Sequence, residues 1–257
     1  MSEDALARWL AALEARHLRD LTFQEVRRAL QALSSTYVQR RGRLAQGAAL
    51  EGAGKRAAFA LFYGPLHFLT VREVVRALGA AGPAPSEVLD LGCGPGAAGA
   101  AWAREARPAP PVHGVDRSGW AVDEARWTLR QLGLRGTVAK GDAKKARLPR
   151  AGGAVLAAYT LNELDEGPRE RLLDRLFSAA GVSVLVVEPI AVTVSPWWSP
   201  WAARVAAAGG RADEWRFRVP LPDLVARLDR AARLDHRQLT ARSLWLPRFA
   251  VRPSRPR

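Results

Sequence analysis

The sequence contains very little cysteine, and this scarcity narrows the chemistry open to it. Cys93 is the only cysteine among 257 residues. A single thiol excludes a disulfide within the chain and any metal site built from several cysteines of one chain. The histidines show no metal-ligand spacing either, so we expect no bound metal. The four histidines are His17, His67, His113 and His236.

Long apolar runs are also missing. No stretch of 18 uninterrupted apolar residues occurs, so we expect no membrane span. The sequence begins with acidic residues and lacks the apolar segment of a signal peptide. Together with the scarce cysteine, these features favour a cytoplasmic protein. The hydrophobic content of 48% supports a sizeable core.

Lysine is also rare in this sequence. Of the 39 basic residues four are lysines, which leaves 35 arginines, and the formal net charge is +14. Such a charge favours anionic partners, RNA among them, and the basic clusters lie at Arg40–Arg43 and Lys140–Arg150. An excess of arginine over lysine is also typical of GC-rich genomes. Charge alone therefore leaves both explanations open.

The chain divides near Gly82–Pro85, a segment rich in proline and glycine. Before it, Thr22 and Glu25 have the spacing of a helix capping box, and apolar residues follow at helical spacing. We expect a helical N-terminal extension or lid over residues 1–82 and a second domain over residues 83–257.

From residue 86 onward, short apolar runs alternate with helical segments, which predicts a parallel sheet covered on both faces. The predicted strands are 88–91, 112–115, 137–139, 154–158 and 182–187. The predicted helices are 97–107, 119–132, 167–180 and 220–234. Residues 239–246 and 249–252 are expected to form a closing antiparallel pair.

The most informative segment is residues 87–96, which read EVLDLGCGPG. An apolar strand ends at Asp90, and a turn with glycine at every second position leads into a helix of small residues. Without Cβ atoms, such a turn lets a ligand approach the backbone and the free N–H groups of the helix. Asp90 is placed to accept a hydrogen bond from a ligand ammonium group.

This pattern resembles motif I of the class I methyltransferases, which use S-adenosylmethionine (SAM). The resemblance implies a Rossmann-like α/β fold with a seven-stranded sheet and SAM as the cofactor. It predicts that SAM is bound by Asp90 and by the loop residues Gly92, Cys93, Gly94, Pro95 and Gly96.

A dinucleotide site is the alternative. Gly94–Gly99 also fits the G-x-G-x-x-G fingerprint, and Asp116 lies near the position of its ribose-binding acid. A lone match of this kind is weak. Asp90 and the later strand ends favour SAM over NAD.

In a doubly wound sheet the ligand lies beyond the carboxyl ends of the strands. Asp116, followed by Arg117 and Ser118, ends the second predicted strand and is expected to bind ribose hydroxyls, or else to cap the next helix. Asp142 and Ala143 follow the third strand. Asp142 is expected to accept a hydrogen bond from the adenine amino group, or else to be a turn residue.

The fourth strand end, residues 158–164, faces the methyl group in class I enzymes, so Tyr159 is expected beside the cofactor. Asn162 and Glu163 are the catalytic candidates, because they could orient an acceptor nitrogen or receive its proton. Alternatively, Asn162 caps a helix and Glu163 is solvated. Glu188, at the fifth strand end, is expected in the same cleft as a substrate-binding residue.

Aromatic residues give two further predictions. Trp197 and Trp198 could stack on a flat acceptor, or could form a packed lid or a dimer patch. The segment Lys55–His67 is expected to pack over the site, with Tyr63 near the cofactor and His67 near the substrate.

A closer resemblance rests on four segments: 29–41, 88–96, 158–164 and 186–189. They resemble the methyltransferase-like family associated with the mitochondrial small ribosomal subunit and its bacterial relatives. That family implies a helical N-terminal extension, a link to ribosome assembly, and Asn162 in the SAM pocket. Its members carry a cysteine set for an iron–sulfur cluster, which this chain lacks.

The sequence thus predicts a SAM-dependent methyltransferase whose acceptor is open, with RNA or a ribosomal particle as the first hypothesis. The alternatives are a small-molecule or protein N- or O-methyltransferase, and a SAM-binding assembly factor without turnover. Methyl transfer needs an in-line nucleophile close to the methyl carbon, so orientation and removal of water supply much of the catalysis.

Overall fold

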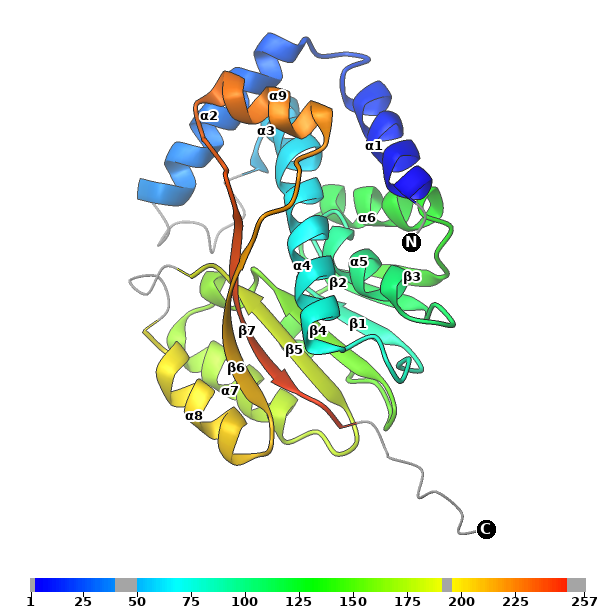
Figure 1. The fold of residues 1–257 in the computed structure, drawn as a ribbon, viewed down its shortest axis with the longest axis vertical. Helices are drawn as coiled ribbons and strands as arrows, with labels where there is room; N and C mark the ends of the chain where they lie inside the picture. The colour runs from blue at the N-terminus through cyan, green and yellow to red at the C-terminus, as the bar shows by residue number, and fades with distance from the viewer. Residues whose placement is uncertain (1–2, 40–49, 191–195, 249–257) are drawn as a thin grey trace.

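The computed structural model describes residues 3–39, 50–190 and 196–248. Figure 1 shows a central twisted sheet with helices on both faces and a group of N-terminal helices at one end. The sheet lies between two layers of helices, and the site is built at the ends of its strands.

The sheet has seven strands in the order β3-β2-β1-β4-β5-β7-β6. The strands β1 to β5 pair in parallel, and β7 runs antiparallel to both β5 and β6. This confirms the predicted Rossmann-like, seven-stranded class I methyltransferase sheet. The strands are β1 Val88–Leu91, β2 Val112–Asp116, β3 Gly136–Lys140, β4 Ala154–Ala158, β5 Ser183–Glu188, β6 Arg211–Phe217 and β7 Leu239–Leu246.

The central strands are buried on both faces because successive side chains point to opposite sides of the sheet. In β4, Leu156 belongs to one apolar core, whereas Val155 and Ala157 belong to the other. The first core lies under α4 (Gly64–Leu78), α5 (Ala97–Glu105) and α6 (Gly119–Gln131). The second lies under α7 (Glu166–Phe177) and α8 (Trp198–Ala207).

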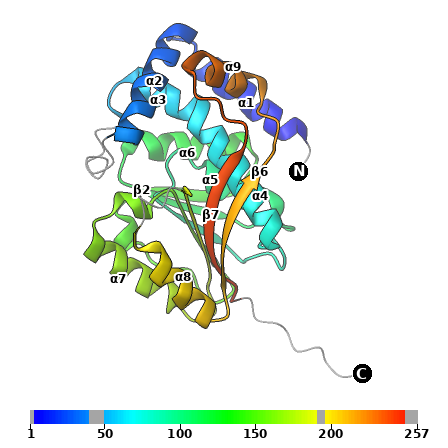
Figure 2. The same ribbon diagram turned by 60° about the vertical axis from the view of Figure 1, so that its left-hand side comes forward.

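The N-terminal helices form a cap beside the sheet. They are α1 (Glu3–His17), α2 (Phe23–Gln39), α3 (Ala53–Ala58) and the π-helix η3 (Phe59–Tyr63). Figure 2 shows α9 (Asp223–Ala232) lying next to α2, so the cap includes a segment from far along the chain. The capping box is present: Glu25 accepts the Thr22 backbone N–H over 2.8 Å, and Thr22 Oγ1 accepts that of Glu25 over 3.3 Å.

The cap shares its apolar core with the sheet. Trp9 and Leu30 are buried in the same cluster as Val88 and Leu156. Glu124 on α6 also accepts hydrogen bonds from His17 (2.8 Å) and is 1% exposed. The division of the chain at residue 82 stays a prediction, because cap and sheet are packed together.

The edge of the sheet differs from the prediction. The partner of β7 is β6, a strand that the sequence analysis missed, and residues 249–252 lie outside the described residues. An edge strand buries only part of its surface, and β6 carries Arg211, Asp213, Glu214 and Arg216 with no long apolar run. The apolar signal used to find strands is therefore weak in β6.

In the described part of the chain, no helix is long and apolar enough to cross a membrane.

Candidate active site

The larger cavity lies at the carboxyl ends of β1, β2, β3 and β4 and has a volume of about 640 Å³. Residues from all four strand ends line it, together with Leu50, Phe59 of η3 and His67 of α4. The predicted site residues found in its lining are Asp90, Gly92, Cys93, Gly94, Pro95, Asp116, Arg117, Ser118, Asp142, Ala143, Tyr159, Glu163 and His67. Gly96 belongs to the same loop but is absent from the lining.

The glycine loop needs glycine for two physical reasons. Gly92, Gly94 and Gly96 have φ values of 63°, 51° and 78°, which side chains adopt at a cost. At Gly92 a Cβ would lie 2.5 Å from Thr160. At Gly94 a Cβ would meet only Phe59, at 3.9 Å, so its open side faces the cavity. The loop can therefore present its backbone directly to a ligand.

Asp116 ties the glycine loop to the next helix. Its carboxylate accepts the backbone N–H of Gly94 over 2.9 Å and that of Ser118 over 2.8 Å. Ser118 Oγ in turn accepts the backbone N–H of Ala121 over 3.3 Å and caps α6. A carboxylate has further lone pairs, so Asp116 can bind a ligand hydroxyl and hold the loop at once.

Asp90 is a buried carboxyl group below the loop. It is 1% exposed, and its Oδ2 accepts the backbone N–H of Gly99 over 2.9 Å. Burial raises its pKa to about 7, and the nearby charge of Asp116 acts in the same direction. A cationic ligand group would favour its ionised form.

Burial likewise raises the pKa of the Cys93 thiol far above its usual range, which makes Cys93 an inert wall residue.

Asp142 is a turn residue that also lines the first cavity, and its contact with adenine stays a prediction. It begins a short 3₁₀ turn by accepting the backbone N–H of Lys144 over 3.0 Å, and it lines the cavity. Burial raises its pKa, but the hydrogen bonds and charge of Lys144 outweigh burial, so the pKa lies below the usual value. Asp142 is thus an ionised acceptor at the third strand end.

A second cavity, of about 360 Å³, adjoins the first. Both cavities are lined by Phe59, His67, Tyr159 and Glu163. The remaining walls come from η3, α4, the turn after β4, the end of β5, the α9–β7 connection and the start of β7. They are Tyr63, Leu66, Thr70, Asn162, Glu188, Pro189, His236, Gln238, Leu239 and Thr240. Because β7 runs antiparallel to β5, its first residues lie at the edge where the parallel strands end.

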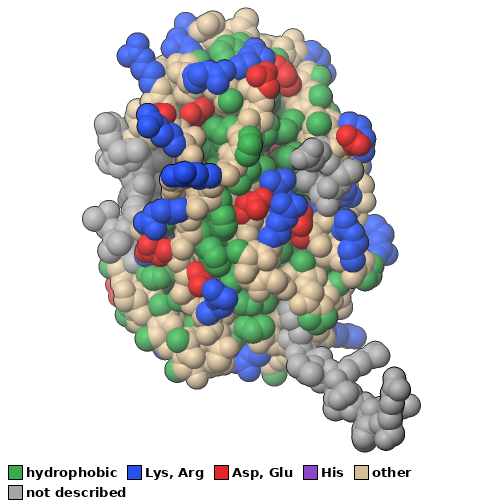
Figure 3. Space-filling view, in the orientation of Figure 1, with side chains coloured by type: hydrophobic (Ala, Val, Ile, Leu, Met, Phe, Trp, Pro, Cys, Tyr) green, Lys and Arg blue, Asp and Glu red, His purple; other side chains and the backbone are tan. Residues whose placement is uncertain are grey.

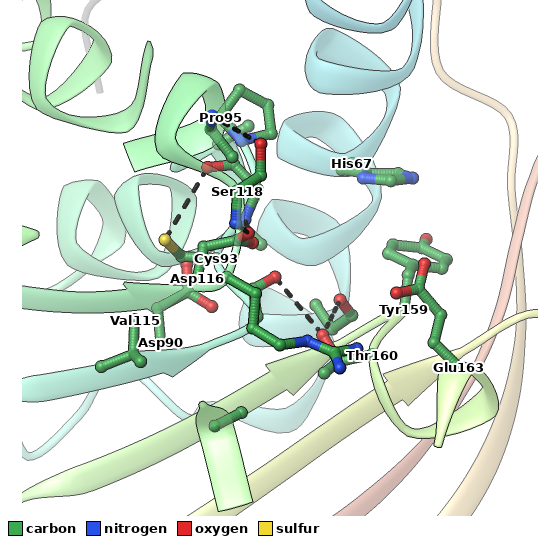
Figure 4. Close-up of a pocket in the computed structure, with 18 of the residues that line it drawn as sticks. His67, Asp90, Cys93, Pro95, Val115, Asp116, Ser118, Tyr159, Thr160 and Glu163 are labelled. Atoms are coloured by element: carbon green, nitrogen blue, oxygen red, sulfur yellow. Dashed lines mark hydrogen bonds between the residues drawn. The ribbon is translucent and has the colours of Figure 1, made fainter. Parts of the chain in front are cut away.

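Two aromatic rings form the junction of the cavities. His67 and Tyr159 stack with their centroids 4.0 Å apart and their planes 15° apart. Tyr159 has a φ of 57°, an uncommon conformation for a residue other than glycine that often occurs at functional sites. Burial lowers the pKa of His67 to about 3, so its imidazole is neutral. Figure 4 shows His67, Tyr159 and Glu163 together on one side of the close-up, away from Asp90 and Cys93.

Glu163 supplies the carboxyl group at this junction. It ends the 3₁₀ turn Leu161–Glu163 after β4 and is half-buried. Burial raises its pKa to about 7, and the charge of Asp116 adds to the effect. A carboxyl group with a pKa near neutrality can act as a general base at ordinary pH.

Asn162 faces a different set of groups. Its side-chain N–H donates to Glu188 over 2.7 Å, and its oxygen accepts the indole N–H of Trp197 over 3.0 Å. Glu188 also accepts the backbone N–H of Leu161 over 2.8 Å, and burial raises the pKa of Glu188 to about 8. These hydrogen bonds hold the turn that carries Glu163, so the contacts of Asn162 and Glu188 position the Glu163 side chain.

Three of the predicted aromatic site residues do not line the first cavity. Tyr63, in η3, lines the second cavity instead. Trp197 and Trp198 are 6% and 8% exposed and line neither cavity. Helix α8 begins at Trp198, and its packing buries both indoles in the core under α7 and α8.

Several lining residues were not among the predicted site residues, and three of them bring side chains that bear on the chemistry. Phe59 and Thr160 border the first cavity, and His236 borders the second. Thr160 follows the predicted fourth strand end and donates its hydroxyl to the carbonyl of Leu91 over 2.9 Å, so its position in the sequence was a usable signal. Within the described residues, no group of three or more His, Cys, Asp and Glu side chains could hold a metal ion.

The comparisons with known proteins agree with this fold. Residues 88–180 match the family model described as a methyltransferase domain. Mitomycin 7-O-methyltransferase MmcR is 18% identical, with 95% of this chain and 75% of that chain covered and a TM-score of 0.53. An O-methyltransferase family protein from Burkholderia thailandensis is 17% identical, with coverages of 83% and 63% and a TM-score of 0.53.

Magnesium protoporphyrin IX methyltransferase (ChlM) from Synechocystis PCC 6803, solved with bound SAM, is 16% identical, with coverages of 84% and 95% and a TM-score of 0.47. No curated protein matches the chain in sequence. Residues 88–180 therefore form a methyltransferase domain, and the chain has the fold of the class I, SAM-dependent methyltransferases.

Proposed function

We propose that this protein transfers the methyl group of SAM to a small, largely apolar acceptor bound in the second cavity. The observation that carries the proposal is the junction: both cavities share Phe59, His67, Tyr159 and Glu163. A methyltransferase must bring donor and acceptor together within an enclosed space. Two adjoining cavities at the strand ends supply that arrangement.

The first cavity fits SAM by the chemistry of its lining. Asp116 would accept hydrogen bonds from the ribose hydroxyls, and Asp142 from the adenine amino group. Gly94 leaves its backbone open to the ligand, and the buried carboxyl of Asp90 is a partner for the ammonium group of the amino-acid tail. Tyr159 lies at the end of this cavity that meets the second one.

When bound, SAM supplies an electrophilic methyl group. The residues of the chain then have three tasks. Phe59 and His67 exclude water at the junction, the loop and Asp116 hold the donor, and Glu163 takes the proton of an acceptor hydroxyl or amine at its carboxylate oxygen. The network of Asn162 and Glu188 positions the turn that carries Glu163.

Two measurements test the proposal. Calorimetry with the demethylated cofactor, S-adenosylhomocysteine (SAH), measures binding in the first cavity. Methyl-labelled SAM is then incubated with the dialysable and macromolecular fractions of a cell lysate. We expect label in the dialysable fraction with wild type and with Glu166→Gln, an exposed control, and far less with Glu163→Gln. Label that enters only the macromolecular fraction contradicts a small acceptor.

An RNA acceptor is the second candidate. It is supported by the net charge of +14 and by Arg117 and Lys144, which lie at or beside the first cavity. The cluster Arg40–Arg43 lies outside the described residues. Figure 3 shows Lys and Arg side chains spread over one face with Asp and Glu among them. The resemblance to the ribosome-associated family also supports this candidate.

Salt dependence distinguishes the two candidates. RNA binding through phosphates weakens steeply with salt, and neutralising Lys144, Lys145 and Arg147 should reduce the slope by up to about 3. Transfer to a small acceptor should change little with either treatment. Turnover that is insensitive to both rules out RNA as the acceptor.

A further inference from the structure

His236 is a polar side chain of the second cavity, the cavity assigned above to the acceptor, at the wall next to the start of β7. It lies in the connection between α9 and β7 and lines the second cavity but not the first. Glu163, in contrast, lines both cavities. The cavity therefore has Glu163 at the junction with the cofactor site and His236 at a wall away from it, besides the polar lining residues Asn162, Glu188, Gln238 and Thr240.

Asp229 fixes the orientation of His236. One carboxylate oxygen accepts the backbone N–H of His236 over 2.9 Å, and the other contacts Nδ1 over 2.5 Å. Asp229 is 5% exposed, so this contact is made by a buried carboxylate. A carboxylate accepts hydrogen bonds, so Nδ1 carries a proton, and in the neutral tautomer this leaves the lone pair on Nε2. In the part of the chain that the structure describes, Nε2 has no hydrogen-bond partner.

The connection before His236 is held in an unusual shape. Arg233 ends α9 with a φ of 61°, and Asp235, directly before His236, has a φ of 50°. Left-handed residues other than glycine persist where the surroundings impose them. The backbone N–H of Leu234 also bonds to the Asp229 carbonyl over 3.1 Å, and the His236 ring packs edge-on against Phe62 at 5.5 Å. Asp229 and its helix end thus impose the position of the imidazole.

The lining of the second cavity is rich in aromatic rings. Phe59 lies 5.6 Å from Tyr63 and 5.9 Å from His67, and His67 stacks on Tyr159. All four rings line the second cavity. Aromatic side chains bind planar apolar molecules by stacking and edge contacts. This lining favours a planar acceptor over a flexible chain.

We propose that His236 selects the acceptor: its Nε2 accepts a hydrogen bond from a second donor group of a planar aromatic hydroxyl or amine whose reacting group lies at Glu163. Asp229 is a positioning residue that holds the required tautomer. This inference rests on the proposed function, because it concerns the cavity assigned there to the acceptor. It narrows the acceptor to aromatic molecules with two hydrogen-bonding groups at separate ends.

The test uses three probes that share one para-disubstituted ring and differ in the number of hydroxyl donors: hydroquinone, its monomethyl ether and its dimethyl ether. Binding of each to the full chain saturated with SAH is measured by ligand-observed NMR. We expect hydroquinone to bind about three- to tenfold more tightly than the dimethyl ether, as expected for neutral hydrogen bonds. In His236→Phe this preference should fall to the part contributed at Glu163, whereas His236→Gln, which keeps an acceptor oxygen, should retain more of it.

Two controls keep the result specific. His113→Phe changes a histidine that lines neither cavity and should leave the preference unchanged. Long-range proton–nitrogen NMR should show His236 protonated on Nδ1, and Asp229→Ala should shift it toward the other tautomer. A protein that binds SAH but does not prefer hydroquinone, or that keeps the full preference in His236→Phe, overturns this inference and leaves methyl transfer intact. Failure to bind SAH would instead overturn the proposed function.

Discussion

The side-chain amide of Asn162 donates a hydrogen bond to the buried carboxyl group of Glu188 over 2.7 Å. This bond joins the ends of two neighbouring parallel strands, β4 and β5. Asn162 also receives the Trp197 indole N–H, so it links the sheet to the start of α8. The only asparagine in the chain therefore uses both its donor and its acceptor in tertiary contacts.

Asn162→Ala should destabilise the protein more than it changes cofactor binding. The substitution leaves the Trp197 N–H without its acceptor and removes a donor from Glu188. Each lost hydrogen bond of this kind costs about 1–3 kcal/mol when a buried partner is left unsatisfied. Urea unfolding measures the loss in the free energy of unfolding, with Gln131→Ala at an exposed position as the control. A variant as stable as wild type would show that these hydrogen bonds do not contribute to the free energy of unfolding.

Glu188 should make stability depend on pH. Its ordinary pKa of 4.5 is raised to about 8 by burial in the folded protein. Between these values the unfolded chain loses the proton and the folded chain keeps it, so ionisation favours unfolding as pH rises. The contribution of Glu188 to stability is therefore full below about pH 4.5 and is lost as pH rises through about 8.

Unfolding curves of wild type and Glu188→Gln across this range measure the effect. The difference between them should change by up to about 1.4 kcal/mol per pH unit. The variant keeps a neutral side chain of the same shape, so its own curve should be flatter. Parallel curves would mean that Glu188 is ionised in the folded protein.

The sequence predicted the cofactor end of the site better than the acceptor end. Asp90, Asp116 and Asp142 each lie at or just after the end of a predicted strand, and the rule that ligands lie beyond parallel strand ends places all three in one cavity. The parallel pairing of β1 to β5 follows from the alternation of strands and helices, whereas the seven-stranded arrangement was predicted from the resemblance to the class I methyltransferases. These features are local patterns in the chain that combine through a general rule of topology.

The acceptor end depends on contacts that no local pattern reveals. Asp229 and His236 are joined by a turn with two left-handed residues that are not glycine. Trp197 and Trp198 form a conspicuous pair in the sequence, but burial in the second core decides their role. The edge strand β6 has an exposed, charged pattern, so its pairing with β7 follows only from the completed sheet.

Activity should rise with pH through the range in which Glu163 ionises. Burial raises the pKa of Glu163 to about 7, and only the ionised carboxylate can accept a proton. With the acceptor that incorporates label, kcat/KM should fall as pH drops below about 7. Glu163→Gln should lower kcat/KM by about 10²- to 10⁴-fold and remove this pH dependence, while SAH affinity is kept. A pH profile that is unchanged in Glu163→Gln would assign the base to another group.

Metal removal should leave methyl transfer unchanged. In the described residues no cluster of metal-ligating side chains occurs, and the chain has one cysteine. Elemental analysis should find less than one iron or zinc ion per chain, and dialysis against a chelator should not reduce kcat. A tightly held stoichiometric metal would contradict this prediction.

Asp116→Ala should remove most of the cofactor affinity. The carboxylate holds Gly94 over 2.9 Å and Ser118 over 2.8 Å, and it is also the proposed partner of the ribose hydroxyls. Losing two charge-assisted hydrogen bonds should weaken SAH binding by about 2–4 kcal/mol, measured by calorimetry. Asp123→Ala, at an exposed position on α6, is the control and should bind SAH like wild type. NAD should bind weakly or not at all to either protein, because Asp90 precedes the glycine loop. Tight NAD binding without SAH binding would show that the loop serves a dinucleotide.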